Sequence, residues 1–531
     1  MKRSFLQYTW SLSIVFCAVV SAVGGTNAAS DVPTVGITLT GPEIENLRLP
    51  DVRIVSATHV EGETEETVGS EPGKNEGRKA AHYKVDGIIG GTIHFELLLP
   101  DEWNGRFTMG GGGGYVGSVA NVMRGTVHQG YATVGTDTGH QWPSGIQAGW
   151  ALDNVEAQVN FGYGAVHRTA EVAKAIVRAC YGRDPEYSYF VGCSRGGGQA
   201  MMESQRYPED FDGIVAGAPA FDWTGFMTAM VHVQQVNYPD PKNLEEGVIT
   251  RDNLTLLAGL VRERCDKLDG VEDGVLDDPR ECDFDWSSIP ECEGDAPGPD
   301  CLTSAQKKAL QAIYEGIPRK QGRPYPAIPL GTEQEEGFFT WIVGPESGLL
   351  KQSGIPNLWY GFGTEFYKFI VFNDPNWDYS QYDPSRCEKD THLVGTFLNA
   401  TNPDLSGLKT NGGKLIIWHG WSDAALSAQA TVDYFEEAEK TDANIRDYCR
   451  LYLLPGVGHC GGGTGPDKVD WFAAIIDWVE NGNPPERLVA RKMDKEGEVI
   501  RSRPVYPYPL RAVYTGAGST DDADNFTLQT P

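Results

Sequence analysis

A serine-centred pentapeptide near the middle of the chain has the pattern of a nucleophile turn. Gly192-Cys193-Ser194-Arg195-Gly196 fits G-x-S-x-G, follows a run of strand-forming residues and opens a glycine-rich helix start. In such a strand-to-helix turn the serine Oγ stands clear of the sheet, and small neighbours let the strand and the helix pack closely. The bare pattern is common and also fits a serine in an ordinary turn. Its context favours a nucleophile at Ser194.

A serine hydroxyl needs a base to take its proton, and the base needs an acid to orient it. After a turn of this kind, the acid and then the base follow the serine in the chain, each at the end of a later strand. Asp423 ends the run KLIIWHGWSD, and His459 ends the run LYLLPGVGH. The sequence therefore predicts a triad of Ser194, Asp423 and His459.

Three further side chains are alternative candidates. His419 lies on the strand before the acid, where a packed and hydrogen-bonded histidine is the more usual occurrence. Asp137 and His140, in the run GTDTGH, could orient nearby loops.

Acyl transfer puts negative charge on the former carbonyl oxygen, which needs backbone N–H donors. One expected donor is the amide of Arg195, directly after the nucleophile. The second is expected from the glycine run 110–114, and Gly113 is our choice within it. A glycine run can also bind phosphate, but the chain has no G-x-x-x-x-G-K-[ST] motif.

The elements that must position these residues follow an α/β pattern. Strand-like runs alternate with amphipathic helical segments from about residue 92 to residue 222, and again from about residue 412. This alternation predicts a mostly parallel sheet whose two faces are covered by helices.

The interval between these two parts is too long for a structureless loop, so we interpret it as an inserted domain. It contains four cysteines and a dense set of aromatic residues. The predicted organisation is a signal peptide in 1–29, a catalytic domain in 30–222 and 408–515, an inserted domain in 223–407 and a flexible tail in 516–531.

Composition and charge exclude some classes of function. The chain has 531 residues, of which 40% are hydrophobic and 22% charged, as in a folded protein. Its formal net charge is −29, which would repel nucleic acid and anionic membranes. We therefore expect no nucleic-acid partner.

The first residues have the order of a secretory signal. Lys2 and Arg3 precede an apolar run from about Trp10 to Val23, and small residues follow through Ala29. An uncleaved anchor is the alternative, but the run is shorter than the ~20 residues of a membrane span. We expect a secreted or periplasmic protein with no membrane span in its mature part.

Export permits disulfides, and nine of the ten cysteines lie outside the signal. Cys193 precedes the proposed nucleophile, and Cys460 follows the proposed base. If Ser194 and His459 are within hydrogen-bond reach, these neighbours are close enough for a bridge. Two separate thiols are the alternative.

Three stretches of the chain resemble the tannase and feruloyl esterase family, which also includes a bacterial mono(2-hydroxyethyl) terephthalate hydrolase. They are YFVGCSRGGGQAMMESQRYPEDFDGIVAGAPA, GGKLIIWHGWSD and PGVGHCGGG, within a likeness from about Trp103 to Trp478. Cys-Ser and His-Cys together are specific to this family. Many members carry arginine where this chain has Gly198, which leaves the helix contacts there open.

The resemblance implies a secreted serine esterase with an α/β-hydrolase core and a large inserted lid domain. It places the nucleophile on Ser194, the acid on Asp423, the base on His459 and a bridge between Cys193 and Cys460.

An acidic segment of the insert, CDKLDGVEDGVLDDPREC, could bind calcium or form a solvated turn. The resemblance favours a structural calcium ion. By position it implies these ligands: Asp266, Asp269, Asp273 and the carbonyls of Val271 and Val275.

The cysteines of the insert would then close two loops, Cys265 with Cys282 and Cys292 with Cys301. A bridge between Cys387 and Cys449 is a further expectation, and Cys180 is expected to be buried on a helix.

The aromatic residues of the insert could line an acyl pocket or form the core of the insert itself. We expect two or three of them to face substrate; the candidates are Phe338, Phe339, Trp341, Trp359, Tyr360, Phe362, Phe366, Phe369 and Trp377.

The resulting hypothesis is a carboxylesterase that hydrolyses galloyl, feruloyl or hydroxycinnamoyl-type esters through an acyl-enzyme. One alternative is a serine hydrolase of the same core that cleaves another ester or a peptide. The other is a non-catalytic, calcium-dependent binding protein on a hydrolase scaffold.

Overall fold

The computed structural model describes residues 33–63, 79–142, 144–317, 325–333, 335–344, 350 and 354–530. The predicted signal peptide, 1–29, lies outside these residues. Among the helices within them, none combines the length and the apolar character that a membrane span requires.

A nine-stranded sheet forms the centre of the described structure, in the order β11-β10-β9-β8-β6-β7-β4-β3-β2. The strands from β11 to β7 are parallel, whereas β4, β3 and β2 continue the sheet as antiparallel neighbours. The bounds are β2 (Val52–Val60), β3 (His82–Ile89), β4 (Ile93–Pro100), β6 (Arg106–Gly110), β7 (Ala132–Thr136), β8 (Tyr187–Cys193), β9 (Gly213–Gly217), β10 (Lys414–Gly420) and β11 (Cys449–Leu454).

Successive side chains of a strand point to opposite faces of the sheet, and both faces are buried. In β10, Leu415 and Ile417 belong to one core, and Ile416 and Trp418 belong to the other. Helices α4 (Ala165–Tyr181), α5 (Arg195–Arg206) and α15 (Ala428–Thr441) contribute to the first core, and α16 (Trp471–Asn481) contributes to the second. This is the covered, mostly parallel sheet of an α/β hydrolase, as the sequence predicted.

Parallel strands bring their carboxyl ends to one edge of the sheet. The register pairs Gly110 at the end of β6 with Val191 near the end of β8, and Gly420 at the end of β10 with Leu454 at the end of β11. The glycine run, the serine turn and the loops that follow β10 and β11 therefore all leave the sheet at this edge.

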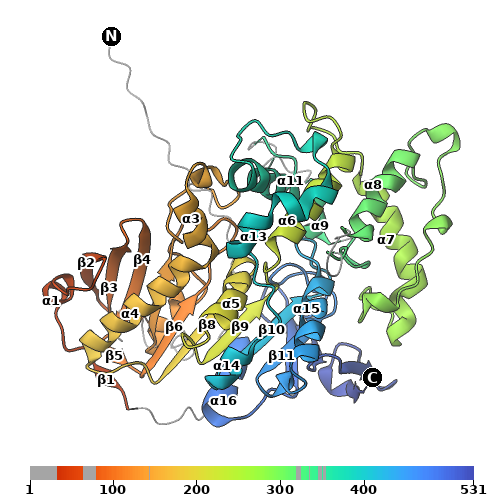
Figure 1. Ribbon diagram of the computed structural model, residues 1–531. Helices are drawn as coiled ribbons and strands as arrows, with labels where there is room; N and C mark the ends of the chain where they lie inside the picture. The colour runs from red at the N-terminus through yellow and green to blue at the C-terminus, as the bar shows by residue number, and fades with distance from the viewer. Residues whose placement is uncertain are drawn as a thin grey trace.

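The chain between β9 and β10 forms the insert, and several of its helices lie over the ends of β8, β9 and β10 (Figure 1). Helices α7 and α8 extend to one side of the sheet. The described helices of this part are α6 (Trp223–Asn237), α7 (Arg251–Cys265), α8 (Ser304–Glu315), α9 (Glu336–Phe338), α11 (Leu358–Glu365), α12 (Cys387–Asp390), α13 (His392–Leu398) and α14 (Ser406–Thr410), with π-helical turns η8 (Phe339–Val343) and η9 (Phe366–Val371).

The insert packs directly on the catalytic core. The hydroxyl of Tyr115, which follows the glycine run, donates to the carbonyl of Phe362 at 3.0 Å. The indole N–H of Trp359 donates to the carbonyl of Ala425, just after the loop that holds Asp423, at 3.2 Å. Aromatic side chains on both sides of these contacts belong to one continuous buried cluster.

Two small hairpins complete the C-terminal part. Strand β12 (Leu488–Met493) pairs with β13 (Val499–Val505), and β14 (Arg511–Tyr514) pairs with β15 (Phe526–Gln529). The segment predicted to be a flexible tail thus contains a strand. The ring of Phe526 is buried under the guanidinium of Arg503, which anchors this strand to β13.

The described residues contain three disulfides: Cys193–Cys460, Cys265–Cys282 and Cys292–Cys301. The expectation of a bridge between Cys387 and Cys449 is wrong. The Cys387 thiol contacts Thr224 and Thr228, whereas Cys449 is a separate buried thiol at the start of β11.

Candidate active site

Ser194 occupies a strained turn between β8 and α5. Its φ of 62° and ψ of −122° are rare for a residue with a Cβ. Its N–H donates to the carbonyl of Gly217 at 3.0 Å, and its own carbonyl accepts from the amides of Gly198 at 3.0 Å and Ala220 at 2.9 Å. These three hydrogen bonds hold the turn against β9 and keep the serine hydroxyl at the sheet edge.

The structure brings Ser194, His459 and Asp423 into one hydrogen-bonded chain. The Nε2 of His459 lies 2.9 Å from the Oγ of Ser194, and its Nδ1 lies 2.8 Å from the Oδ2 of Asp423. Asp423 is fully buried, and the side chain of His459 is 4% exposed. In this arrangement His459 Nδ1–H donates a hydrogen bond to Asp423, which leaves Nε2 unprotonated and able to accept the serine proton.

Asp423 is held by four donors. Its Oδ1 accepts from the amides of Ala425 at 2.7 Å and Leu426 at 3.0 Å. Its Oδ2 lies 3.0 Å from the Nε2 of His419, in addition to the contact with His459. Burial alone would raise the pKa of Asp423, but the two histidines outweigh it and hold that pKa well below its usual range. The acid is therefore ionised.

The disulfide Cys193–Cys460 joins the residue before the nucleophile to the residue after the base. The two Cα atoms are 5.9 Å apart, although the cysteines are separated by 267 positions in the chain. This bond ties the end of β8 directly to the loop after β11 and restricts their relative movement.

The glycine run lies directly against the start of α5. A Cβ at Gly111 would come within 2.4 Å of the Cα of Gly196, so the loop and the helix approach more closely than any other residue would allow. The amide of Gly112 donates to the side chain of Gln199 at 3.1 Å. Gly113 follows, and a Cβ there would meet no atom within 4 Å.

The Arg195 side chain turns away from solvent and is 1% exposed. Its guanidinium donates to the carbonyls of Phe161 and Gly162 and lies over the ring of Phe161 at 4.3 Å. Burial lowers the pKa of Arg195 to about 9. The side chain thus secures α5 to the π-helical turn η3 (Asn160–Gly164).

Gly198 stands where many members of the resembling family carry arginine, and the structure gives a steric reason for glycine in this chain. A Cβ at that position would lie 2.1 Å from the carbonyl oxygen of Ala220. Helix α5 therefore packs on the loop after β9 at a distance that admits only glycine here.

Asp137 and His140 stand outside the triad. The Nε2 of His140 lies 2.8 Å from the carbonyl of Tyr115, and its ring stacks on Trp150. Burial lowers the pKa of His140 to about 4. Asp137 accepts from the amide of His94 at 3.0 Å, and burial raises its pKa to about 7. Both side chains brace the loops beside the glycine run.

One aromatic side chain of the insert, Trp341, adjoins the base, and a second, Phe362, packs behind it. The ring of Trp341 meets His459 edge-on with ring centres 5.1 Å apart, and Phe362 stacks on Trp341 at 5.8 Å. By contrast, Trp377 stacks on Tyr367 within the insert itself. The other candidate aromatics belong to the buried core or pack against it.

The acidic segment forms tight turns closed by its own backbone amides. Asp269 accepts from the amides of Val271 at 2.8 Å and Asp277 at 3.3 Å. Asp266 accepts from the amide of Gly274 at 2.9 Å, and Asp273 accepts from the guanidinium of Arg503 at 2.7 Å.

Its carboxylates are close enough to repel one another. Burial, together with the charges of Asp273 and Asp266, raises the pKa of Asp269 to about 6. Burial likewise raises the pKa of Asp277 to about 7. Arg501 and Arg503 both pair with Asp273 and offset part of the negative charge. The carboxylate and carbonyl oxygens that remain are the kind of ligand that a hard cation such as Ca²⁺ takes.

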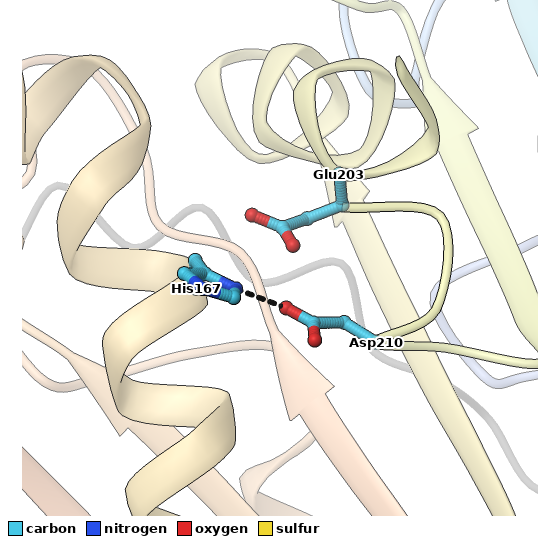
Figure 2. Close-up of side chains that lie close together, drawn as sticks. All are labelled: His167, Glu203 and Asp210. Atoms are coloured by element: carbon cyan, nitrogen blue, oxygen red, sulfur yellow. Dashed lines mark hydrogen bonds and ion pairs between the residues drawn. The ribbon is translucent and has the colours of Figure 1, made fainter. Parts of the chain in front are cut away.

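A cluster of side chains close enough together to hold a metal ion lies elsewhere, at the far end of α5. His167 on α4, Glu203 on α5 and Asp210 in the loop before β9 point toward one another (Figure 2). The Nδ1 of His167 already lies 2.7 Å from Asp210. The Lys174 ammonium donates to the Asp210 carbonyl, and its positive charge also favours the ionised form of Glu203. His167 and Lys174 offset part of the negative charge, but burial and the neighbouring Asp210 raise the pKa of Glu203 well above its ordinary value.

Comparisons with known proteins agree with this geometry. The family described as tannase and feruloyl esterase matches residues 81–528. A probable feruloyl esterase from Arthroderma benhamiae is 33% identical over 81% of each chain. The mono(2-hydroxyethyl) terephthalate hydrolase of Piscinibacter sakaiensis is 32% identical over 83% of this chain and 82% of its own.

Solved structures show the same fold. The crystal structure of feruloyl esterase B from Aspergillus oryzae has a TM-score of 0.78 and 25% identity, and the match covers 92% of this chain and 100% of that one. The tannin acyl hydrolase of Aspergillus niger has a TM-score of 0.71 at 23% identity, with 94% and 97% covered.

The fold and the site define an α/β hydrolase that acts on carboxylic esters. The chain belongs to the tannase and feruloyl esterase family.

Sequence reasoning missed several residues that support the site. Thr431 contacts His419, Gln199 holds the amide of Gly112, and the His167 cluster joins α4 to α5. No motif marks these residues, because their partners lie on other elements.

Proposed function

We propose that the protein is an exported serine esterase that hydrolyses esters of aromatic acids through an acyl-enzyme. The observation that carries this proposal is the chain of hydrogen bonds from Ser194 through His459 to Asp423. Membership of an esterase family supports the same chemistry.

The proposed reaction has two halves. In the first, Ser194 Oγ attacks the ester carbonyl while His459 Nε2 takes its proton, and Asp423 stabilises the imidazolium that forms. Collapse of the tetrahedral intermediate expels the alcohol, which receives that proton from His459. In the second half, His459 takes a proton from water, which attacks the acyl carbon. His459 then returns that proton to Ser194 Oγ as the bond to the acyl group breaks and the acid leaves.

The amides of Arg195 and Gly113 are the proposed oxyanion donors. The amide of Arg195 is at the first position of α5, where helical N–H groups have no partner within the helix. In the glycine run, the amide of Gly111 donates to Val191 and the amide of Gly112 to Gln199. The amide of Gly113 has no acceptor among the described residues, which supports a role in binding the oxyanion.

The aromatic acid is proposed because of the side chains beside the base. Trp341 lies edge-on to His459 and stacks on Phe362, and flat rings favour aromatic partners through stacked or edge-on contacts. The names of the A. benhamiae and P. sakaiensis relatives refer to feruloyl and terephthalate esters. Both acyl groups are aromatic.

A panel of galloyl, feruloyl, caffeoyl and phthaloyl esters tests the substrate class, with aliphatic esters and a peptide as comparisons. We expect the highest kcat/KM on one of the aromatic esters. A preference for the aliphatic ester or the peptide would contradict this part of the proposal.

Labelling with a fluorophosphonate tests the mechanism. Ser194 should be modified, and Ser194→Ala should fold normally yet lose both labelling and turnover. Undiminished hydrolysis by Ser194→Ala would overturn the assignment.

We also propose a structural calcium ion in the acidic segment, held by the carboxylates of Asp266, Asp269 and Asp273 and the carbonyls of Val271 and Val275. The ion would neutralise the segment and has no part in the reaction. Export is proposed because three disulfides suit an oxidising compartment. N-terminal sequencing of the mature protein tests export, with a start near Ser30 expected.

A further inference from the structure

We propose that His419 is a positioning residue for the catalytic acid, and that Thr431 selects the ring nitrogen of His419 that carries the proton. This inference rests on the serine mechanism proposed above. It assigns a function to a histidine that is neither a member of the triad nor in contact with Ser194 in the described structure.

The observation behind it is that one carboxylate oxygen serves two imidazoles. The Oδ2 of Asp423 lies 2.8 Å from His459 Nδ1 and 3.0 Å from His419 Nε2. The other ring nitrogen of His419, Nδ1, lies 2.8 Å from the hydroxyl of Thr431. His419 and Asp423 are both 0% exposed, and Thr431 is 1% exposed, so no bulk water replaces these contacts.

The hydrogen-bonding chemistry of Asp423, His419 and Thr431 determines which atoms carry protons. An ionised carboxylate only accepts hydrogen bonds, so His419 Nε2 must carry a hydrogen and donate it. A neutral His419 then has a bare Nδ1, which accepts from the Thr431 hydroxyl. A charged His419 beside a charged His459 would place two cations on one buried anion during the reaction, which is unfavourable. With His419 neutral and Thr431 as donor, both ring nitrogens of His419 have a hydrogen-bond partner.

The arrangement affects both the position and the basicity of the acid. Strand β10 carries His419, the following turn carries Asp423, and α15 carries Thr431, so the contacts connect the acid to two elements of the core. A carboxylate oxygen that already accepts one hydrogen bond is a weaker acceptor for the next. His419 therefore limits how strongly Asp423 holds the proton on His459. The titratable side chains that face Asp423 in the described structure are these two histidines.

Three variants distinguish the effect of the hydrogen bonds made by His419 and Thr431 from the effect of their packing. His419→Phe keeps a flat ring without a donor, His419→Gln keeps an N–H near the place of Nε2, and Thr431→Val keeps the shape of threonine without its hydroxyl. Thr169→Val is the matched control, because Thr169 is a buried threonine on α4 away from the triad. Thermal melting and fluorophosphonate labelling establish that each variant is folded and has a reactive serine.

The decisive readout is the pH profile of kcat/KM on the best ester of the panel, whose acid limb reports the pKa of the base. For His419→Phe we expect this limb to move to higher pH by roughly one unit, because Asp423 becomes the stronger acceptor. Thr431→Val should move the limb in the same direction by less, and His419→Gln should restore most of the wild-type profile. The low-field proton NMR signal of the His459–Asp423 hydrogen bond should shift in His419→Phe, independently of turnover.

Two results would overturn the inference. One is a wild-type acid limb in His419→Phe and Thr431→Val. The other is an equal loss of kcat in His419→Phe and His419→Gln with no movement of the limb, which would indicate packing alone. If His419→Phe fails to fold, Thr431→Val and His419→Gln decide the question. Failure of the serine mechanism itself is distinguishable, because wild-type Ser194 would then remain unlabelled.

Discussion

The indole ring of Trp341 stands edge-on to the imidazole of His459, with ring centres 5.1 Å apart and an interplanar angle of 76°. Trp341 belongs to the insert, whereas His459 follows the last strand of the parallel part of the sheet. The insert thus contributes directly to the surroundings of the base. Substrate preference and catalytic geometry are therefore expected to depend on the same contact.

Trp341→Ala should lower kcat/KM for aromatic esters by about tenfold, because the aromatic acyl group loses a ring partner worth about 1.5 kcal/mol. Trp377→Ala is the control, because Trp377 stacks on Tyr367 inside the insert. The control should lower the melting temperature and leave KM unchanged. Equal effects of the two substitutions on kcat/KM would contradict a role for Trp341 in binding.

Replacing both Cys193 and Cys460 with alanine should lower kcat, since the bridge fixes the distance between the nucleophile and the base. A displacement of 1 Å between reacting groups costs about a hundredfold in rate. Loss of the bridge should also cost about 2–5 kcal/mol of stability. Steady-state kinetics and denaturant unfolding measure both effects.

Replacing Cys292 and Cys301 is the matched control for this experiment. That bridge closes a loop with a sequence separation of 9 in the insert, so its loss should leave kcat unchanged. An unchanged kcat in the Cys193 and Cys460 double variant would remove the proposed role of their bridge.

The stability of the protein should depend on the protonation of Asp137. Burial raises its pKa to about 7 from 3.8, so the folded protein holds this proton more tightly than the unfolded chain does. The resulting stabilisation is complete below a pH of about 4, decreases as the pH rises and is lost above 7. Its full size is about 4 kcal/mol.

Asp137→Asn should remove this dependence, because the amide resembles the protonated acid and keeps an oxygen for the His94 amide. The difference in unfolding free energy between wild type and Asp137→Asn should therefore fall from pH 4 to about pH 7 and become level above it. A constant difference over this range would show that Asp137 is ionised throughout.

Calcium should raise the melting temperature if the acidic segment binds it. At a hundred times its Kd, a bound ion adds about 2.7 kcal/mol to stability. Chelation should remove this gain, and Asp269→Asn should abolish the response to calcium. Asp285→Asn, which changes an exposed acid of the same insert, should respond as wild type does. No calcium-dependent shift in the wild-type protein would exclude the site.

The sequence was sufficient to predict the fold and to name the side chains that meet at the sheet edge. Ser194, Asp423 and His459 follow strands that alternate with helices, and parallel strands must end at a common edge. The structure does bring these three together, and their catalytic roles remain predictions. The Cys193–Cys460 bridge could be predicted by the same reasoning, because each cysteine is adjacent to a residue of the triad.

Other features had no signal along the chain. The count of cysteines gave no distances, and the expected bridge between Cys387 and Cys449 was wrong because their elements are not neighbours in the way a disulfide requires. The reason for glycine at position 198 could not be predicted, because it lies in the carbonyl of Ala220, 2.1 Å from where a Cβ of residue 198 would be.

The sequence by itself determined which residue types stand at which strand ends, because hydrophobic periodicity and turn composition are local properties. Only the tertiary structure decided that Trp341 faces His459, that Thr431 contacts His419 and that the tail contributes a strand. Such contacts depend on how helices and loops from distant parts of the chain pack on the sheet, and packing is a property of the whole fold.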